Sequence, residues 1–159
     1  MTNHTTQTAN GVARDLVLNM RVAGDPKAQG SMKHVGGGRM VHSPGLTEWR
    51  QRVTNTAMVT AGTNKVTWRP IDEPVGAALE FVLKRPHRPR WDEPATGLDI
   101  DKLQRAIFDG LAPKVKGRTP RWAFLKDDSR VCEVHTTKRY ARPGETPGVS
   151  VLIWKRKEE

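Results

Sequence analysis

Apolar residues alternate with polar ones along several stretches of the chain. Leu16, Leu18 and Met20 fall on one face of an extended segment, and Leu79 and Phe81 do the same further along. A period of two is typical of strands that bury one face. The ranges that we predict as strands from their patterns are 15–22, 75–83, 130–141 and 148–154, and a short strand could form at 39–42.

Two other segments repeat their apolar residues every three or four positions, which predicts helices with one buried face. The first covers residues 43–62, where Ser43 is expected to cap the helix and Pro44 to occupy its first position. The second covers residues 101–111. Its apolar stripe consists of Leu103, Ala106, Ile107, Gly110 and Leu111.

The order of these elements predicts an α+β (mixed α/β) fold. One small domain over residues 14–156 would contain a mixed sheet with two main helices packed on it. The sheet cannot be all parallel, because the connection between its last two strands has only about six residues. Residues 1–13 are rich in Thr, Asn and Gln and are expected to be a flexible tail.

Cysteine content and hydropathy indicate a cytoplasmic protein. Cys132 is the single cysteine, so the chain has no internal disulfide, and we expect this residue to be buried on a strand. No apolar run is long enough to span a membrane, and the amino terminus does not resemble a signal peptide.

The charge balance points to a polyanionic partner. The chain has 27 Lys and Arg against 17 Asp and Glu, a net charge of +10. Because self-repulsion opposes folding, nucleic acid is the leading explanation, an anionic membrane surface is the second, and solubility alone is the third. Half of the excess lies in residues 84–121. The predicted DNA-binding residues are Lys84, Arg85, Arg88, Arg90, Lys102, Lys114, Lys116, Arg118 and Arg121.

Aspartates in this basic region and shortly after it are candidates for a metal site. Asp99 and Asp101 stand where a loop meets the second helix, and Asp127 and Asp128 precede a later strand. Carboxylates that share one space repel unless a cation lies between them, and Mg²⁺ suits a site with few carboxylates and several waters. We therefore predict that Asp99, Asp101 and Asp128, with Asp127 beside them, bind Mg²⁺, for which Mn²⁺ is a possible substitute.

Each of these residues could instead have a purely structural role. Asp101 could cap the helix together with Gln104, and Asp127–Asp128 could form a turn before the strand. Arg105, one turn beyond Asp101, could hold a phosphate or a transition state, or only a helix salt bridge.

Two tryptophans in the basic region have open roles. Trp91 and Trp122 could stack on exposed bases, but packing in the core is the interpretation that we favour.

Two motifs of the sequence resemble the RusA family of crossover (Holliday) junction endodeoxyribonucleases. They are D-I-D-K-L-Q-R-A-I-F-D-G-L at 99–111 and L-K-D-D-S-R-V at 125–131, and the segment 26–32 and the helix with Trp49 and Arg50 also fit. The resemblance covers most of residues 16–154. Lys102 stands where the family has Asn, Arg105 stands where it has Lys, and the loop 113–122 is longer and more basic.

The resemblance implies a homodimer that resolves four-way DNA junctions by paired Mg²⁺-dependent hydrolysis in recombination and repair. Asp99, Asp101 and Asp128 match the catalytic acids, Asp127 matches the adjacent acid, and Arg105 takes the place of a functional lysine. Because arginine does not lose its proton, this replacement argues against a proton-transfer role at position 105. We expect the protein to bind neither a membrane nor a small-molecule cofactor. The alternatives are a DNA-binding accessory protein without catalysis, and a nuclease for flaps or other branched DNA.

Overall fold

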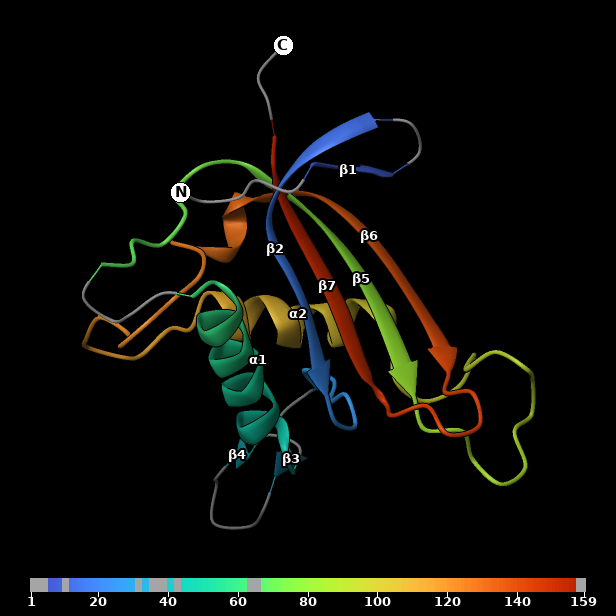
Figure 1. Cartoon of the computed structure of the whole chain (residues 1–159). Coiled ribbons are helices and arrows are strands. Elements are labelled where there is room, and N and C mark those ends of the chain that lie inside the picture. The colour runs from blue at the N-terminus through green and yellow to red at the C-terminus, as the bar shows by residue number, and fades with distance from the viewer. Residues whose placement is uncertain are drawn as a thin grey trace.

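The computed structural model describes residues 6–9, 12–30, 33–34, 40–41, 44–62 and 67–156 (Figure 1). Its early elements are β1 (Thr6–Ala9), β2 (Val12–Ala23), β3 (Lys33–His34), β4 (Met40–Val41) and helix α1 (Leu46–Thr60). The later ones are β5 (Val75–Leu83), helix α2 (Ile100–Leu111), the short 3₁₀ helix η1 (Asp128–Arg130), β6 (Val131–Tyr140) and β7 (Gly148–Lys155).

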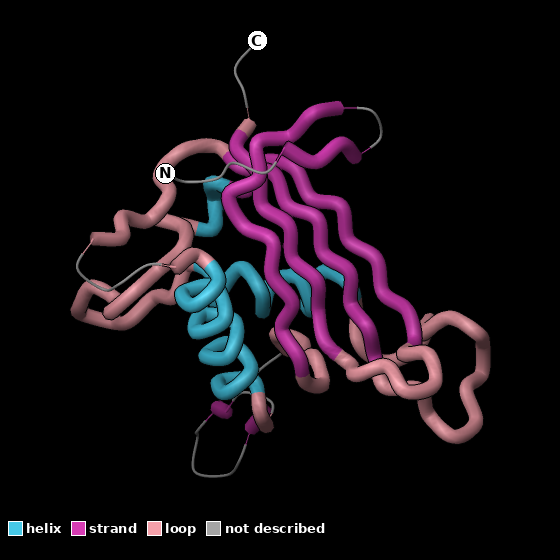
Figure 2. Tube along the Cα trace, viewed as in Figure 1, coloured by secondary structure: helices cyan, strands magenta, loops and turns pink. Residues whose placement is uncertain are grey.

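The main sheet has five strands in the order β1-β2-β7-β5-β6, and β3 and β4 form a separate ribbon (Figure 2). Only β5 and β6 pair in parallel, because the chain crosses over through α2 between them, whereas the other neighbours are antiparallel. The mixed sheet predicted from the sequence is confirmed. β6 and β7 follow each other in the chain, yet β5 lies between them, and β6 is an outer strand.

Both helices cover the same face of the sheet. Inward-facing residues such as Met20, Phe81 and Val151 form one buried cluster with the apolar stripes of α1 and α2. In α2 the buried residues are Leu103, Ala106, Ile107, Gly110 and Leu111, which is the predicted stripe. The α+β fold of one small domain is therefore confirmed.

The two helices touch closely at Gly110. A Cβ added there would lie 2.8 Å from Cβ and Cγ1 of Val53 in α1 and 3.0 Å from the carbonyl oxygen of Arg50. Thr54 reinforces the contact, since its hydroxyl donates to the Gly110 carbonyl oxygen at 2.6 Å. The missing side chain at Gly110 thus sets how near α1 lies to α2.

Some local predictions were wrong. Helix α1 begins at Leu46 rather than Pro44, because Gly45 adopts φ 81°, which is outside the helical region. Ser43 lies outside the described residues. Cys132 is on β6 as predicted but is exposed, since it is on an outer strand.

Part of the predicted flexible tail over residues 1–13 is a strand. Thr6–Ala9 pairs with residues 12–15 as an antiparallel hairpin. The domain boundary at residue 14 itself stays a prediction. In the part of the chain that the structure describes, no helix has the length and apolar character needed to cross a membrane.

We predict that Gly110→Ala destabilises the protein. Helix propensity alone would favour alanine by about 1 kcal/mol. Here the added methyl collides with Val53, so the free energy of unfolding, measured by urea denaturation, should fall by about 1–3 kcal/mol. The test is a double-mutant cycle: Val53→Ala removes Cγ1 and keeps Cβ, so it relieves part of the collision and should be less harmful in the Gly110→Ala chain than in the wild type. Additive losses would contradict the explanation.

Candidate active site

The first pair of predicted acids lies at the amino end of α2. Asp99 is the N-cap residue, with extended backbone angles, and its carbonyl oxygen accepts the Leu103 N–H at 2.9 Å. Asp101 is in the first turn, where a carboxylate interacts favourably with the helix dipole. Both residues are exposed. Oxygen donors so close to water suit a hard cation that keeps part of its hydration shell.

Asp101 does not form the capping box considered from the sequence. The N-cap is Asp99, whose side chain makes no cap hydrogen bond. Gln104 instead accepts a hydrogen bond from the Thr136 hydroxyl of β6 at 2.8 Å. Among the residues that the structure describes, the Asp101 carboxylate has no hydrogen-bond or ion-pair partner, which leaves it available for a ligand.

The second pair of acids lies at η1, before β6. An Asp127 carboxylate oxygen accepts the Ser129 N–H at 2.9 Å and so caps the short helix. Hydrogen bonds from the side chain and the backbone of Ser129 lower the pKa of Asp127 to about 2. The Lys114 ammonium lies 3.8 Å from Asp127 and 3.7 Å from Asp128. The turn interpretation is thus confirmed for Asp127, and both carboxylates share one cation.

These two pairs lie at opposite ends of α2. Lys138, near the end of β6, donates to the Leu98 carbonyl oxygen at 2.8 Å, next to Asp99. At the other end, the N–H groups of Phe124 and Leu125 donate to the Leu111 carbonyl oxygen. A helix of 12 residues is about 18 Å long. Asp99 and Asp101 are therefore separated from Asp128 by about the length of the helix.

The expected convergence of three aspartates in one chain was wrong. Among the residues that the structure describes, no group of three or more His, Cys, Asp or Glu is placed to hold a metal ion. The physical reason is that α2 is a stiff helix of 12 residues with one pair of acids at its amino end and the other beyond its carboxyl end, so the length of the helix keeps the pairs apart. The role of each aspartate as a ligand stays a prediction.

The basic residues predicted as one DNA-binding rim form two groups. Lys84, Arg85, Arg88 and Arg90 are in the loop after β5, on the side of the acids at the start of α2. Lys114, Lys116, Arg118 and Arg121 are in the loop that follows α2. The two loops, yellow-green and gold to orange, lie on opposite sides of the molecule in Figure 1. Each pair of acids thus has its own group of cations.

Two basic residues accompany the first pair of acids on α2. Lys102 lies 3.4 Å from Asp99, with both side chains largely in solvent, so this ion pair contributes little to stability. Arg105 is exposed and has no ion-pair partner among the described residues. The structure therefore gives no support to a helix salt bridge as the role of Arg105.

The two tryptophans have different environments. Trp122 is 6% exposed and stacks on Trp68, with ring centroids 5.6 Å apart, as the core-packing interpretation expected. For Trp91 that interpretation was wrong. Its side chain is 46% exposed, and the Arg90 guanidinium lies 4.3 Å from its ring centroid. Trp91 therefore remains accessible to a nucleic-acid base.

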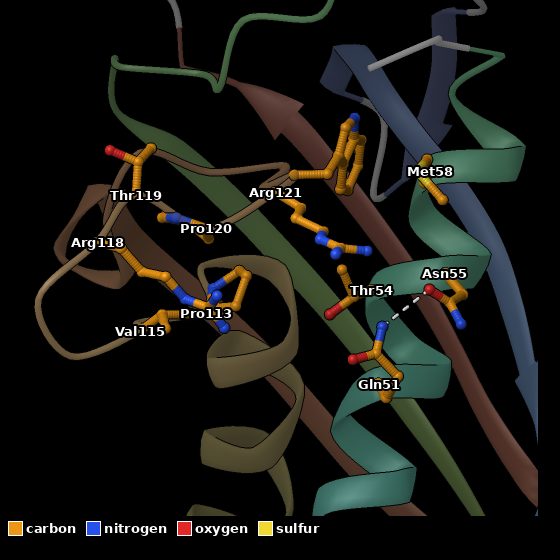
Figure 3. Close-up of a pocket in the computed structure, with 11 residues that line it drawn as sticks. Gln51, Thr54, Asn55, Met58, Pro113, Val115, Arg118, Thr119, Pro120 and Arg121 are labelled. Atoms are coloured by element: carbon orange, nitrogen blue, oxygen red, sulfur yellow. Dashed lines mark hydrogen bonds between the residues drawn. The ribbon is translucent and has the colours of Figure 1, made fainter.

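One hollow of the surface was not predicted from the sequence. A cavity of about 310 Å³ separates α1 from the loop 113–122, and Figure 3 shows side chains from both elements facing it. From α1 it is lined by Gln51, Thr54, Asn55 and Met58. These residues recur at helical spacing on α1. The sequence signal for this hollow was a stripe of polar residues beside the apolar stripe of the helix. Such a stripe does not predict a binding site, because on most helices it faces only water.

Comparison with known proteins identifies the family. A family model described as endodeoxyribonuclease RusA matches residues 23–153, most of the chain. The chain belongs to the RusA family. This confirms the resemblance found at 99–111 and 125–131, and it makes the protein a member of an endodeoxyribonuclease family that acts on branched DNA. No curated protein matches the chain in a sequence comparison.

We predict that Asp127 both caps η1 and contributes negative charge to a metal site. Two substitutions can separate these roles. Asp127→Ala removes the cap of η1 and should lower the melting temperature. Asp127→Asn keeps an oxygen that can accept the Ser129 N–H, so its melting temperature should stay near that of the wild type. If Asp127 also binds a metal ion, Asp127→Asn loses metal-dependent cleavage without loss of stability. Equal melting temperatures for Asp127→Ala and the wild type would exclude the capping role.

Proposed function

We propose that this protein is a Mg²⁺-dependent endonuclease that resolves four-way DNA junctions as a homodimer, in recombination and repair in the cytoplasm. The observation that carries the proposal is the presence, in a RusA-family chain, of two acidic pairs at the surface, one exposed and one half-exposed, each with cations on its own side of the molecule. The cations bind the DNA backbone. When bound, the Mg²⁺ ion would activate a water molecule and stabilise negative charge on the phosphate. Mn²⁺ could take its place.

The chain's own residues would divide the remaining tasks. Asp99 and Asp101 hold the cation with their carboxylate oxygens at the start of α2. Arg105 lies one turn further along the same helix and is exposed, so its guanidinium can contact a phosphate oxygen of the scissile strand. It acts as a fixed charge, since arginine stays protonated.

A second copy of the chain would complete the site. The acids lie at opposite ends of α2. In a two-fold dimer, neighbouring copies of one element can run antiparallel, which brings the amino end of one α2 near the carboxyl end of the other. Asp128 of each copy would then join Asp99 and Asp101 of its partner. The two resulting sites are related by symmetry, as paired incisions on a four-way junction require.

The surface beside α2 supports such an association. β6 is an outer strand, and its free edge can accept further pairing. Val134 on β6 is 36% exposed, and Leu98 and Ile100 at the start of α2 are 36% and 37% exposed. Exposed large apolar side chains on an outer strand and on the helix beside it favour contact with another protein surface.

Asp101→Asn tests the metal site. We expect it to abolish junction cleavage in Mg²⁺ while leaving junction binding intact, because the substitution removes charge at the cation and almost no volume. Cleavage of a labelled four-way junction and binding in EDTA are measured in parallel with duplex and flap substrates. Wild-type cleavage by Asp101→Asn would show that the site is elsewhere. Junction binding by the wild type without any metal-dependent product would instead favour a non-catalytic DNA-binding protein.

Mixing two inactive variants tests whether the partner supplies Asp128. In a mixed dimer of Asp101→Asn with Asp128→Asn, one site collects both substitutions and the other is intact if Asp128 acts across the interface. The mixture should then regain nicking of one strand, with about a quarter of the wild-type sites active after random pairing. If each chain builds its own site, every site carries a substitution and no activity returns. Sedimentation gives the oligomeric state.

A further inference from the structure

We infer that the groove between α1 and the loop 113–122 binds the phosphodiester backbone of the DNA strand that passes Asp128. We name this surface the α1 groove and define it by Gln51, Thr54 and Asn55 of α1 together with Lys114, Arg118 and Arg121 of the loop. The inference rests on the proposed function and adds to it the polar wall of α1 and a groove that runs along this wall, away from the acids at the start of α2.

The shape of the α1 groove suits an extended chain. Two cavities, of about 310 and 440 Å³, share Gln51, Thr54, Pro113 and Val115 in their walls, so they adjoin each other. Along α1 the lining runs from Thr47 to Met58, a rise of about 16 Å at the spacing of an α-helix. That length matches about five nucleotides of a duplex strand, which rises 3.4 Å for each nucleotide.

The lining chemistry matches a sugar–phosphate backbone. The first cavity contains Arg118 and Arg121 and no acidic residue. Both arginines are exposed, and among the described residues neither has an ion-pair partner. On the opposite wall, Gln51 donates to Asn55 at 2.9 Å, and Figure 3 shows this pair across from the loop. Guanidinium, amide and hydroxyl groups are the side chains that commonly contact phosphate oxygens.

Less polar residues line the groove between these donors. Met58, Pro113, Val115 and Pro120 face the first cavity. They offer apolar surface that fits a deoxyribose ring rather than a highly charged peptide. This mixture of cations and apolar surface favours nucleic acid over an acidic protein partner.

The α1 groove is continuous with the second pair of acids. The second cavity is lined by Arg50, Asp109 and Lys114, and the Lys114 ammonium lies 3.7 Å from Asp128. Nε of Arg50 is buried and has no hydrogen-bond acceptor among the described residues. A strand with its scissile phosphate near Asp128 would therefore enter the groove directly at Lys114.

The test compares two charge-matched double variants in DNA binding. Arg118→Gln with Arg121→Gln removes two cations of the groove. Lys155→Gln with Arg156→Gln removes two cations at the end of β7, where Lys155 pairs with Glu73 at 2.8 Å. Binding to a labelled four-way junction is measured by fluorescence anisotropy in EDTA over a range of salt concentrations. Each lost phosphate contact lowers the slope of log K against log salt by about 0.9, so the groove variant should lose roughly 1.8 and the control almost nothing.

A footprint locates the contact on the DNA. Hydroxyl-radical protection by the wild type should extend beyond the incision point on one side, and the groove variant should lose that extension by about five nucleotides. Equal slopes for both variants, or an unchanged footprint, would overturn the inference. Because binding is measured without metal, loss of these effects is distinguishable from failure of the nuclease proposal, which would appear as absent cleavage with normal binding.

Discussion

The packing of α2 against the sheet is the constraint on which the rest of the site depends. Its stripe of Leu103, Ala106, Ile107 and Leu111 is fully buried, and Gly110 lets α1 lie directly against it. A helix held along its whole length acts as a rigid spacer. It carries one pair of acids at its amino end and leaves the other pair beyond its carboxyl end, so the separation within one chain is set by helix length.

This spacing changes how the charge of the chain is to be understood. In the sequence, the cations from Lys84 to Arg121 look like one basic region, but the fold places them in two loops on different sides of the molecule. Each group lies on the side of its own pair of aspartates, so each can hold a separate stretch of phosphates. The dimer that we propose answers this separation, because a two-fold axis beside α2 can bring unlike ends of the two copies of the helix together.

The loop 113–122 gains a role from its position. It follows α2, returns past α1 and leads into the aromatic stack of Trp68, Trp122 and Phe124, which anchors its end. Its arginines are exposed and without ion-pair partners among the described residues, whereas Lys114 at its start faces Asp127 and Asp128. The loop thus connects the second acidic pair to the polar wall of α1.

The pattern of the chain was sufficient for the elements and the family. Periods of two and of three to four residues predicted β5, α2 and the strands around them, because a segment with one buried face must repeat its apolar residues at the period of its own backbone. The motifs at 99–111 and 125–131 indicated the RusA family, and the match over 23–153 confirmed it. Local exceptions such as the left-handed Gly45 and the exposed Cys132 depend on contacts and sheet order that no local pattern contains.

Which acids face one another was decided only by the tertiary structure. Sequence spacing gives the order of Asp99, Asp101 and Asp128 but not their distances, since α2 can lie between them or beside them. The polar wall of α1 was hidden for the same reason: Gln51, Thr54 and Asn55 acquire a partner surface only when the loop 113–122 folds across from them. The periodicity of apolar residues indicates which face of one helix or strand is buried. A functional site depends on how several helices, strands and loops lie relative to one another, and that arrangement follows from how their side chains pack.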